Sequence, residues 1–532
     1  MTKDRTMKTK LLTLLSLAAL LSCSRGGVDS PEYPHDTSET VHHDMIVLGE
    51  QLEDPYSVEN VTKALSSLYP TKAARLDIAA TDLYVRFLPE DEHQYRMLEE
   101  LGVSLVDHPL DYRIVREGDY YHDPEIEEGE ITWQYAVVSR DFAIPSTITH
   151  EILDECYISE HDISTRSSDS GIDWDEVERE AYRLTGNADM LLPGTRAATA
   201  SNPSGRITIV DPLVAEGKPF GVAGVRVSCN SFVKFAHSYT SRDGFYEMET
   251  KFSSKLRYRL VFTNSKNFSI GLNLILIPAS ISTLGSGPAE GLNVNVTNTS
   301  DERLYRRCVV NNAVYDYISR CSESDMNISL PPRDLRLWIF KNLSSSCTPM
   351  IHHGALIDKS LIGKYLGGYA ELLRKFLPDI IIGTDKSLDY SEIYSVTVHE
   401  LSHASHFSQA GTAWWDNLIE YIISSFIASG KTGYGDGTAS GAGHCEVAEM
   451  WGYFNESKMY KERYGGTVPS FGTSYWFYPQ IFRYLDDRGL TRAEIFRALK
   501  SDVTSRKELQ AKLVSLYPER RGVIDQVFNR YE

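Results

Sequence analysis

Apolar positions near the N-terminus of the 532-residue chain alternate between helical and strand spacing. The pattern predicts a helix over residues 58–68, a strand over 83–88, a helix that ends at Leu101, and a strand over 103–106. Helices and strands that follow one another so closely are typical of a small α+β module. We assign residues 44–164 to this module, in which we identify no catalytic motif.

Residues 165–204 predict a short helix and a linker. Asp173 precedes an acidic amphipathic stretch that ends at Leu184, and a carboxylate at that position suits the start of a helix. Residues 193–204 are rich in Ala, Thr, Ser and Pro, a composition typical of a linker.

Strand-like alternation begins at residue 205. Four short segments show it, and the third contains an Asp243-Gly244 turn signal followed by an aromatic residue: 206–210, 224–228, 241–246 and 256–262. This order resembles the carboxypeptidase regulatory-like domain, a transthyretin-like β-sandwich. The resemblance implies a non-catalytic accessory module, for which we take residues 205–275.

The remaining residues, 276–532, are numerous enough for an enzyme domain. Helical patterns alternate with short apolar strands, and the pattern is mostly helical after Cys445: helices 301–318, 361–376, 391–407 and 417–428, strands 335–340 and 379–383. We therefore expect a multidomain protein with a small α+β N-terminal module, a β-sandwich middle domain and an α+β C-terminal domain.

Composition narrows the classes of function. The apolar fraction is 42% and the charged fraction 24%, as in ordinary folded proteins. The chain carries 54 basic and 73 acidic residues, a net charge of −19. Nucleic-acid binding requires a basic face that neutralises phosphates, so this charge disfavours it.

The first residues have the composition of an export signal. Basic residues precede an apolar run over 11–21 that is too short to span a bilayer. The run ends in Leu-Leu-Ser-Cys at residues 20–23, which resembles the lipobox of bacterial lipoproteins. The resemblance implies removal of residues 1–22, lipidation of Cys23, a tether over 23–43, and anchoring to a bacterial membrane, with the outer membrane or cell surface expected. An ordinary signal peptide with a chance cysteine is the alternative.

Six further cysteines lie in this exported chain, where disulfides can persist. Their sequence positions favour a bond between Cys347 and either Cys308 or Cys321. No pair has C-x-x-C spacing, which disfavours a thiolate zinc site.

The run from Val396 to Phe407 contains H-E-x-x-H. Residues four apart share a helix face, so His399 and His403 can present two imidazoles to one metal ion. Glu400 is then placed to act as general base toward a water molecule bound to that ion. The pattern predicts a Zn²⁺ site.

The third ligand distinguishes the classes of zinc peptidase. Metzincins require glycine and histidine where this chain has His406 and Gln409, so that class is excluded. His406 is about 10 Å from His399 along the helix axis, and we expect it beside the ligands or on the surface.

The segment from His444 to Phe454 resembles the second metal-binding helix of the gluzincins, which supplies a glutamate. The resemblance implies Glu446 as the third ligand, with Glu449 as its rival and Glu420 as a weaker candidate. It also implies a substrate-binding edge strand, for which residues 379–383 are the candidate.

The same resemblance implies an oxyanion-stabilising side chain. Tyr453, Tyr475 and Tyr478 are candidates, with aromatic packing as their alternative role.

Two functions remain open. The first is a membrane-anchored metallopeptidase that acts on a peptide or protein. The second is a non-catalytic surface-binding or assembly lipoprotein that keeps a vestigial zincin fold.

Overall fold

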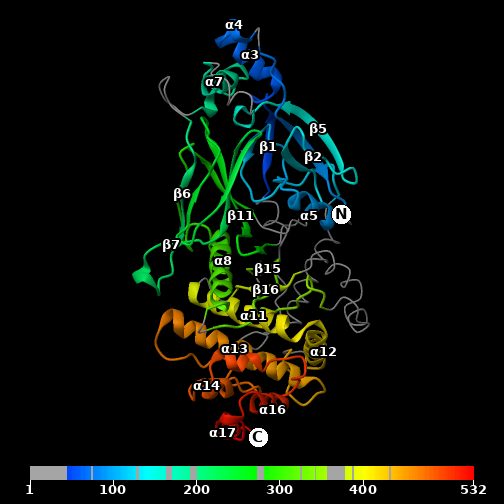
Figure 1. The fold of residues 1–532 in the computed structure, drawn as a ribbon, viewed down its shortest axis with the longest axis vertical. Helices are drawn as coiled ribbons and strands as arrows, with labels where there is room; N and C mark the ends of the chain where they lie inside the picture. The colour runs from blue at the N-terminus through cyan, green and yellow to red at the C-terminus, as the bar shows by residue number, and fades with distance from the viewer. Residues whose placement is uncertain are drawn as a thin grey trace.

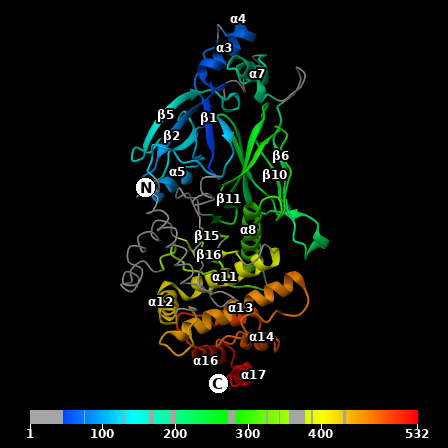
Figure 2. The same cartoon turned by 180° about the vertical axis from the view of Figure 1, so that it is seen from behind.

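The computed structural model describes most of the chain beyond residue 44, in these ranges: 45–73, 76–127, 131–162, 171–191, 200–271, 281–323, 326–341, 343–355, 378–385, 389–429 and 433–531. The expected export signal with Cys23, the expected tether, residues 193–199 of the expected linker and the helix expected over 361–376 lie outside these ranges. The described part is elongated, with the β-sheets and the short N-terminal helices toward one end and the C-terminal helices toward the other (Figures 1 and 2). It is therefore a mixed α+β protein, as predicted.

The N-terminal module is built on a three-stranded antiparallel sheet in the order β4-β2-β5. Helix α5 follows β2, the pair β1–β3 forms a second small sheet, and α3 packs against α7. The bounds of these elements are β1 Val47–Gln51, α3 Val58–Leu68, α4 Pro70–Ala73, β2 Asp82–Leu88, α5 Glu92–Glu100, β3 Tyr112–Arg116, β4 Gln134–Ser139, β5 Thr149–Cys156 and α7 Trp174–Leu184.

Most of the predicted elements of this module are confirmed. Helix α3 has the predicted bounds, and Asp173 caps α7 by accepting a hydrogen bond from the Glu176 amide. The strand predicted over 103–106 is wrong, because this segment makes only a single bridge, between Val106 and Tyr135.

Two sheets face each other in the middle of the chain. One has the order β10-β6-β14 with β7 paired to β6, and the other includes β9, β8, β11 and β13. Their inward side chains, such as Ile207, Val227 and Leu260, share one core. The bounds are β6 Ser204–Ile209, β7 Phe220–Gly221, β8 Val225–Ser231, β9 Lys234–Tyr239, β10 Phe245–Glu247, β11 Leu256–Asn264, β13 Ile281–Gly287 and β14 Val294–Val296.

The larger of these sheets continues across the boundary expected between residues 275 and 276. Strand β12 (Phe268–Ile270) pairs with β11 and, in parallel, with β15 (Leu335–Phe340), which in turn pairs with β16 (Ile380–Gly383). The resulting seven-stranded sheet joins the middle and C-terminal parts, whose buried residues form a single core. Strand pairing and buried side chains thus connect the two parts across this boundary.

Helices complete the C-terminal part. Long helices pack around α11 beneath the end of the sheet, and shorter helices follow toward the C-terminus (Figure 1). Their bounds are α8 Glu302–Cys321, α11 Tyr390–Ala410, α12 Thr412–Ser429, α13 Ala442–Tyr464, α14 Gln480–Asp486, α15 Arg492–Arg497, α16 Arg506–Leu516 and α17 Arg521–Phe528. Among the described residues, no helix combines the length and apolar character needed to cross a bilayer.

A buried ion pair ties the end of α13 to the middle sheets. The fully buried carboxylate of Asp211 accepts hydrogen bonds from Arg463 Nη2 and the Tyr464 hydroxyl, both at 3.0 Å. The Arg463 guanidinium also lies about 5 Å from the ring centres of Tyr390 and Tyr394 at the start of α11. This contact fixes α11 and α13 relative to the sheets.

The six cysteines beyond Cys23 are free and buried, so the expected bond from Cys347 to Cys308 or Cys321 is wrong. Cys308 and Cys321 lie about 20 Å apart along α8. Cys347 instead pairs through its backbone with Ile381 of β16. Burial raises the pKa of each thiol, for example that of Cys321 to about 12, so these groups stay protonated and unreactive.

We predict that the full chain, denatured without reductant, exposes six titratable thiols from these cysteines. Cys23 adds one more if its sulfur carries no lipid. Ellman's reagent measures the count, and a native sample should react far more slowly because the thiols are buried. A count lower by two would indicate a disulfide and contradict the arrangement.

Candidate metal centre

Helix α11 carries the H-E-x-x-H motif through the protein interior. His399, Glu400 and His403 are 2%, 0% and 1% exposed. Because α11 is covered on nearly all sides, it is stabilised by packing around its whole circumference and not by burial of a single apolar face. The helix ends at Ala410, and the C-cap residue Gly411 has a φ of +86°, a value that glycine adopts readily.

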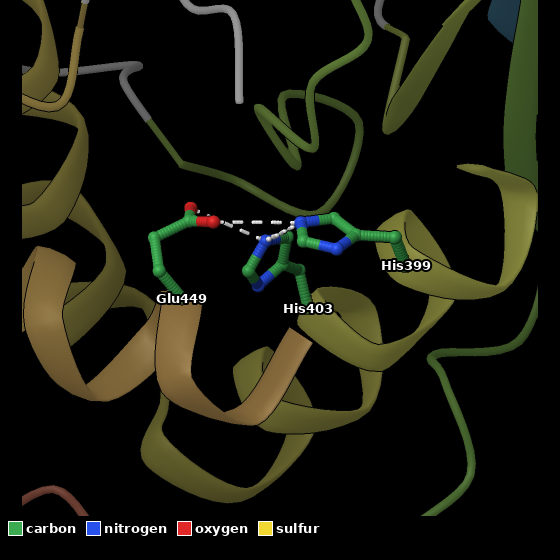
Figure 3. Close-up of side chains that lie close together, drawn as sticks. All are labelled: His399, His403 and Glu449. Carbon is green, nitrogen blue, oxygen red and sulfur yellow. Dashed lines mark hydrogen bonds and ion pairs between the residues drawn. The ribbon is translucent and has the colours of Figure 1, made fainter. Parts of the chain in front are cut away.

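Three side chains meet between α11 and α13 (Figure 3). The Nε2 atoms of His399 and His403 are 3.0 Å apart. One oxygen of Glu449 lies 3.4 Å from His399 Nε2, and the other lies 3.4 Å from His403 Nε2. Among the described residues, this is the single group of three potential ligands whose donor atoms lie within 4.8 Å of one another.

These separations fit a tetrahedral zinc ion. Two ligands at about 2.0–2.1 Å from zinc lie about 3.3 Å apart when the angle between them is tetrahedral. Both oxygens of Glu449 are buried, and each contacts an imidazole nitrogen at 3.4 Å, too long for a good hydrogen bond. A buried carboxylate without hydrogen-bond donors is costly, and a cation would compensate for it. The donor set therefore suits Zn²⁺.

Glu449, and not Glu446, faces the histidines, which corrects the preferred choice of third ligand. Glu446 lies one turn earlier on α13 and is rotated away from α11. Its carboxylate accepts a 3.3 Å hydrogen bond from the Arg506 amide and lies 3.4 Å from Arg506 Nε, at the start of α16. A carboxylate is favourable at a helix N-terminus, which gives Glu446 a structural role.

A second carboxylate orients the first histidine. Glu456 Oε2 lies 3.2 Å from Nδ1 of His399, on the far side of the ring from Glu449. Ser395 donates a 2.8 Å hydrogen bond to the other oxygen of Glu456. Such a carboxylate on the second ring nitrogen fixes the orientation of a metal-binding histidine.

Thr348 orients the carboxylate of Glu400. Its hydroxyl lies 2.7 Å from Glu400 Oε2 and 3.0 Å from the backbone carbonyl of the same residue. Oε1 of Glu400 is buried without a hydrogen-bond partner. One carboxylate oxygen is thus held in place while the other stays available.

The local charges shift several pKa values. Burial raises the pKa of Glu400 to about 8. Burial opposes the charged form of His399, but the carboxylates of Glu449 and Glu456 outweigh it and raise the pKa of His399 to about 10. Burial lowers the pKa of His403. Perturbed groups of this kind cluster at functional sites.

The other candidates lie around the trio. The Tyr453 ring packs 4.4 Å from that of His399, and its hydroxyl lies 3.0 Å from the hydroxyl of Tyr434. Tyr475 stacks on Phe477, and Tyr478 packs against Tyr531. Each of the three tyrosines therefore packs against an aromatic ring.

His406 forms no hydrogen bond with the proposed ligands and does not lie on the surface. It is fully buried, with its ring 4.4 Å from that of Trp414, and neither ring nitrogen has a hydrogen-bond partner. Burial lowers its pKa to about 3, so it is neutral. Glu420 lies on α12 and does not belong to the group of three.

The strand expected to bind substrate is covered. Strand β16 is the last strand of its sheet, but its outer edge pairs with the segment that contains Cys347, through Cys347–Ile381 backbone hydrogen bonds of 2.8 and 3.0 Å. The Ser346 hydroxyl also accepts a hydrogen bond from the Gly383 amide. The edge predicted over 379–383 is therefore not free in the described structure.

Sequence reasoning missed Thr348 and Glu456. A signal for Glu456 exists, because Glu449, Gly452 and Glu456 are spaced to share one face of α13. Thr348 has no such signal, since it reaches Glu400 only through the pairing of its segment with β16.

No protein-family model, curated protein or solved structure shows significant similarity to the chain. Any functional conclusion therefore depends on the geometry of the site.

We predict that Gly452→Ala disrupts the centre. A Cβ at this position would lie 2.9 Å from Cε1 of both His399 and His403, closer than packed atoms allow. Overpacking of a core costs about 1–3 kcal/mol, and the metal ligands would have to shift. Chemical denaturation measures the loss.

Gly522→Ala on α17 is the matched control, because nothing lies within 4 Å of the added Cβ. It should stabilise the protein, by at most about 1 kcal/mol, through helix propensity. Equal effects at the two glycines would contradict the close approach at Gly452.

Proposed function

We propose that the protein is a zinc metallopeptidase, exported and lipid-anchored through Cys23, that hydrolyses a peptide or protein. One observation carries the proposal: His399, His403 and Glu449 converge at distances suited to one zinc ion, with Glu400 beside them. Zinc, when bound, supplies a Lewis acid that lowers the pKa of a water molecule and polarises a carbonyl.

Side chains of the protein would then accept and release the proton of that water molecule. Glu400 Oε1 accepts it, while Thr348 holds Oε2 in position. Glu400 then delivers that proton to the leaving amine, so the same carboxylate serves first as base and then as acid. Glu456 keeps His399 oriented toward the metal.

The burial of the centre favours a second candidate function. The three ligands and Glu400 are each at most 2% exposed, and a substrate must reach them. A lipoprotein that keeps zinc for stability and binds a partner elsewhere would need no such access. Zinc content and hydrolysis, measured together, separate the two functions.

We predict that Glu449→Gln lowers zinc affinity by more than about 100-fold, because loss of a ligand should cost more than loss of an outer-shell partner. Glu446→Gln is the matched control on the same helix and should leave zinc content unchanged, since Glu446 contacts Arg506 instead. Elemental analysis and competition with a chromogenic chelator measure both. Loss of zinc in the Glu446 variant alone would reverse the assignment.

We predict that Glu400→Gln keeps one zinc per chain and lowers peptide hydrolysis by about 10²–10⁴-fold, the contribution of a general base. Mass-spectrometric profiling of a peptide library supplies the substrate, and the wild-type protein treated with chelator is the negative control. Unchanged hydrolysis in the variant would refute the role of Glu400. Zinc-loaded wild-type protein that cleaves nothing would support the non-catalytic function.

A further inference from the structure

A cleft of about 760 Å³ opens in the N-terminal module, well separated along the chain from the metal centre. It lies between β1 and the following residues to Asp54 on one side and strands β2, β4 and β5 on the other, with loops 109–112 and 121–125 at its rim. Its volume is in the range of small-molecule and side-chain binding sites, about 300–1,000 Å³.

Negative charge dominates the lining. Six carboxylates face one cationic side chain: Glu53, Asp54, Asp111, Asp123, Glu125 and Asp154 against Arg86. Arg86 is already engaged, because its guanidinium contacts Glu151 at 2.6 Å and stacks over the ring of Trp133 at 4.2 Å. Within the described structure, none of the six carboxylates forms an ion pair.

Asp54 lies deepest among them and is 8% exposed. It accepts a 2.9 Å hydrogen bond from the Tyr56 amide, and its other oxygen faces the weak donor Cys156 Sγ at 3.9 Å. Burial, with further contributions from Asp154 and Asp111, raises its pKa to about 7. A buried carboxylate without a cation is unfavourable, and a positive ligand would compensate for it.

Tyrosine rings supply the rest of the polar wall. Tyr84 and Tyr135 lie side by side with ring centres 6.2 Å apart, and Tyr112 and Tyr121 also line the cleft. The hydroxyl of Tyr84 lies 3.2 Å from Asp111 and holds that carboxylate in place. Aromatic faces beside carboxylates bind organic cations through cation–π and charge interactions together.

The same carboxylates do not suit a bare divalent ion. Calcium requires six to eight oxygen ligands around one point. Among the described residues, only the group on α11 and α13 has three ligand atoms within 4.8 Å of one another. The charge in the cleft is spread out, as an extended cation with an apolar stem would require. Leu52 and Leu153 offer apolar contact to such a stem.

The cleft is also accessible to a polypeptide. Leu153 and Asp154 belong to β5, an edge strand whose residues are mostly exposed. We propose that this cleft binds an arginine or lysine side chain presented by an extended polypeptide. This function does not depend on the metal centre, and it gives the N-terminal module a role in recognising basic partners or substrates.

Fluorescence anisotropy on the full chain tests the proposal, with a labelled Gly-Ser peptide that contains three arginines. The chelator 1,10-phenanthroline is present throughout, so that neither hydrolysis nor zinc contributes. We expect binding that weakens by at least about tenfold when citrulline replaces arginine, because citrulline keeps the shape and loses the charge. This comparison uses only wild-type protein and does not depend on the folding of a variant. Equal binding of the two peptides would overturn the proposal.

Variants locate the binding. Asp111→Asn combined with Asp154→Asn should weaken binding of the arginine peptide by at least about tenfold. Asp141→Asn, at an exposed turn of the same module outside the cleft, should not change it. Equal losses of peptide binding in the two variants would show that the net charge of the protein attracts the peptide. This result would overturn the assignment of binding to the cleft. Stronger binding of spermidine or calcium than of the peptide would overturn the assignment of a polypeptide.

A parallel titration without the chelator supplies the comparison. Peptide binding that occurs only in the absence of the chelator would place the peptide at the metal centre and contradict the proposal. If the protein hydrolyses no peptide but still binds the arginine peptide in the presence of the chelator, the metallopeptidase proposal fails and the cleft proposal stands.

Discussion

Helix α13 contributes no side chain at Gly452, where it contacts α11, and a Cβ there would lie 2.9 Å from carbon atoms of both imidazoles. This contact determines which glutamate completes the site. With the helices so close, Glu449 reaches the two histidines from one turn away, and Glu456 reaches the outer nitrogen of His399 from the following turn. A larger residue at position 452 would move Glu449 away from both histidines and Glu456 away from His399. The chemistry of the centre therefore depends on the packing of two helices.

The rest of the fold holds those helices in register. The seven-stranded sheet continues from β8, β9, β11 and β12, which we assigned to the middle domain from the sequence, to β15 and β16. Helix α11, which carries the motif, follows β16 in the chain. The buried pair of Asp211 and Arg463 ties the far end of α13 to the same sheets. Pairing of the Cys347 segment with β16 places Thr348 against Glu400. The middle sheets therefore have a part in positioning the site, beyond that of an attached accessory module.

Local signals explain what the sequence could predict. Helix periodicity, the Asp173 cap and the H-E-x-x-H spacing act within a few residues, and the corresponding elements appear where predicted. The sequence-based predictions are wrong where contacts between residues far apart in the chain determine the structure. The choice of Glu446 over Glu449 depended on the rotation of α13, which the approach at Gly452 and the competing contact with Arg506 determine. The segment over 103–106 has strand-like residues but only one pairing partner, and the cysteines have positions along the chain that say nothing about their separation in space.

The proposed function requires that His399, His403 and Glu449 hold one metal ion together. An anomalous-difference map, recorded at the zinc edge from crystals of the zinc-loaded protein, tests it directly. We expect one strong peak, about 2.0–2.2 Å from Nε2 of both histidines and from an oxygen of Glu449. A peak at Glu446 or at a cysteine, or zinc-loaded crystals without a peak between α11 and α13, would contradict it.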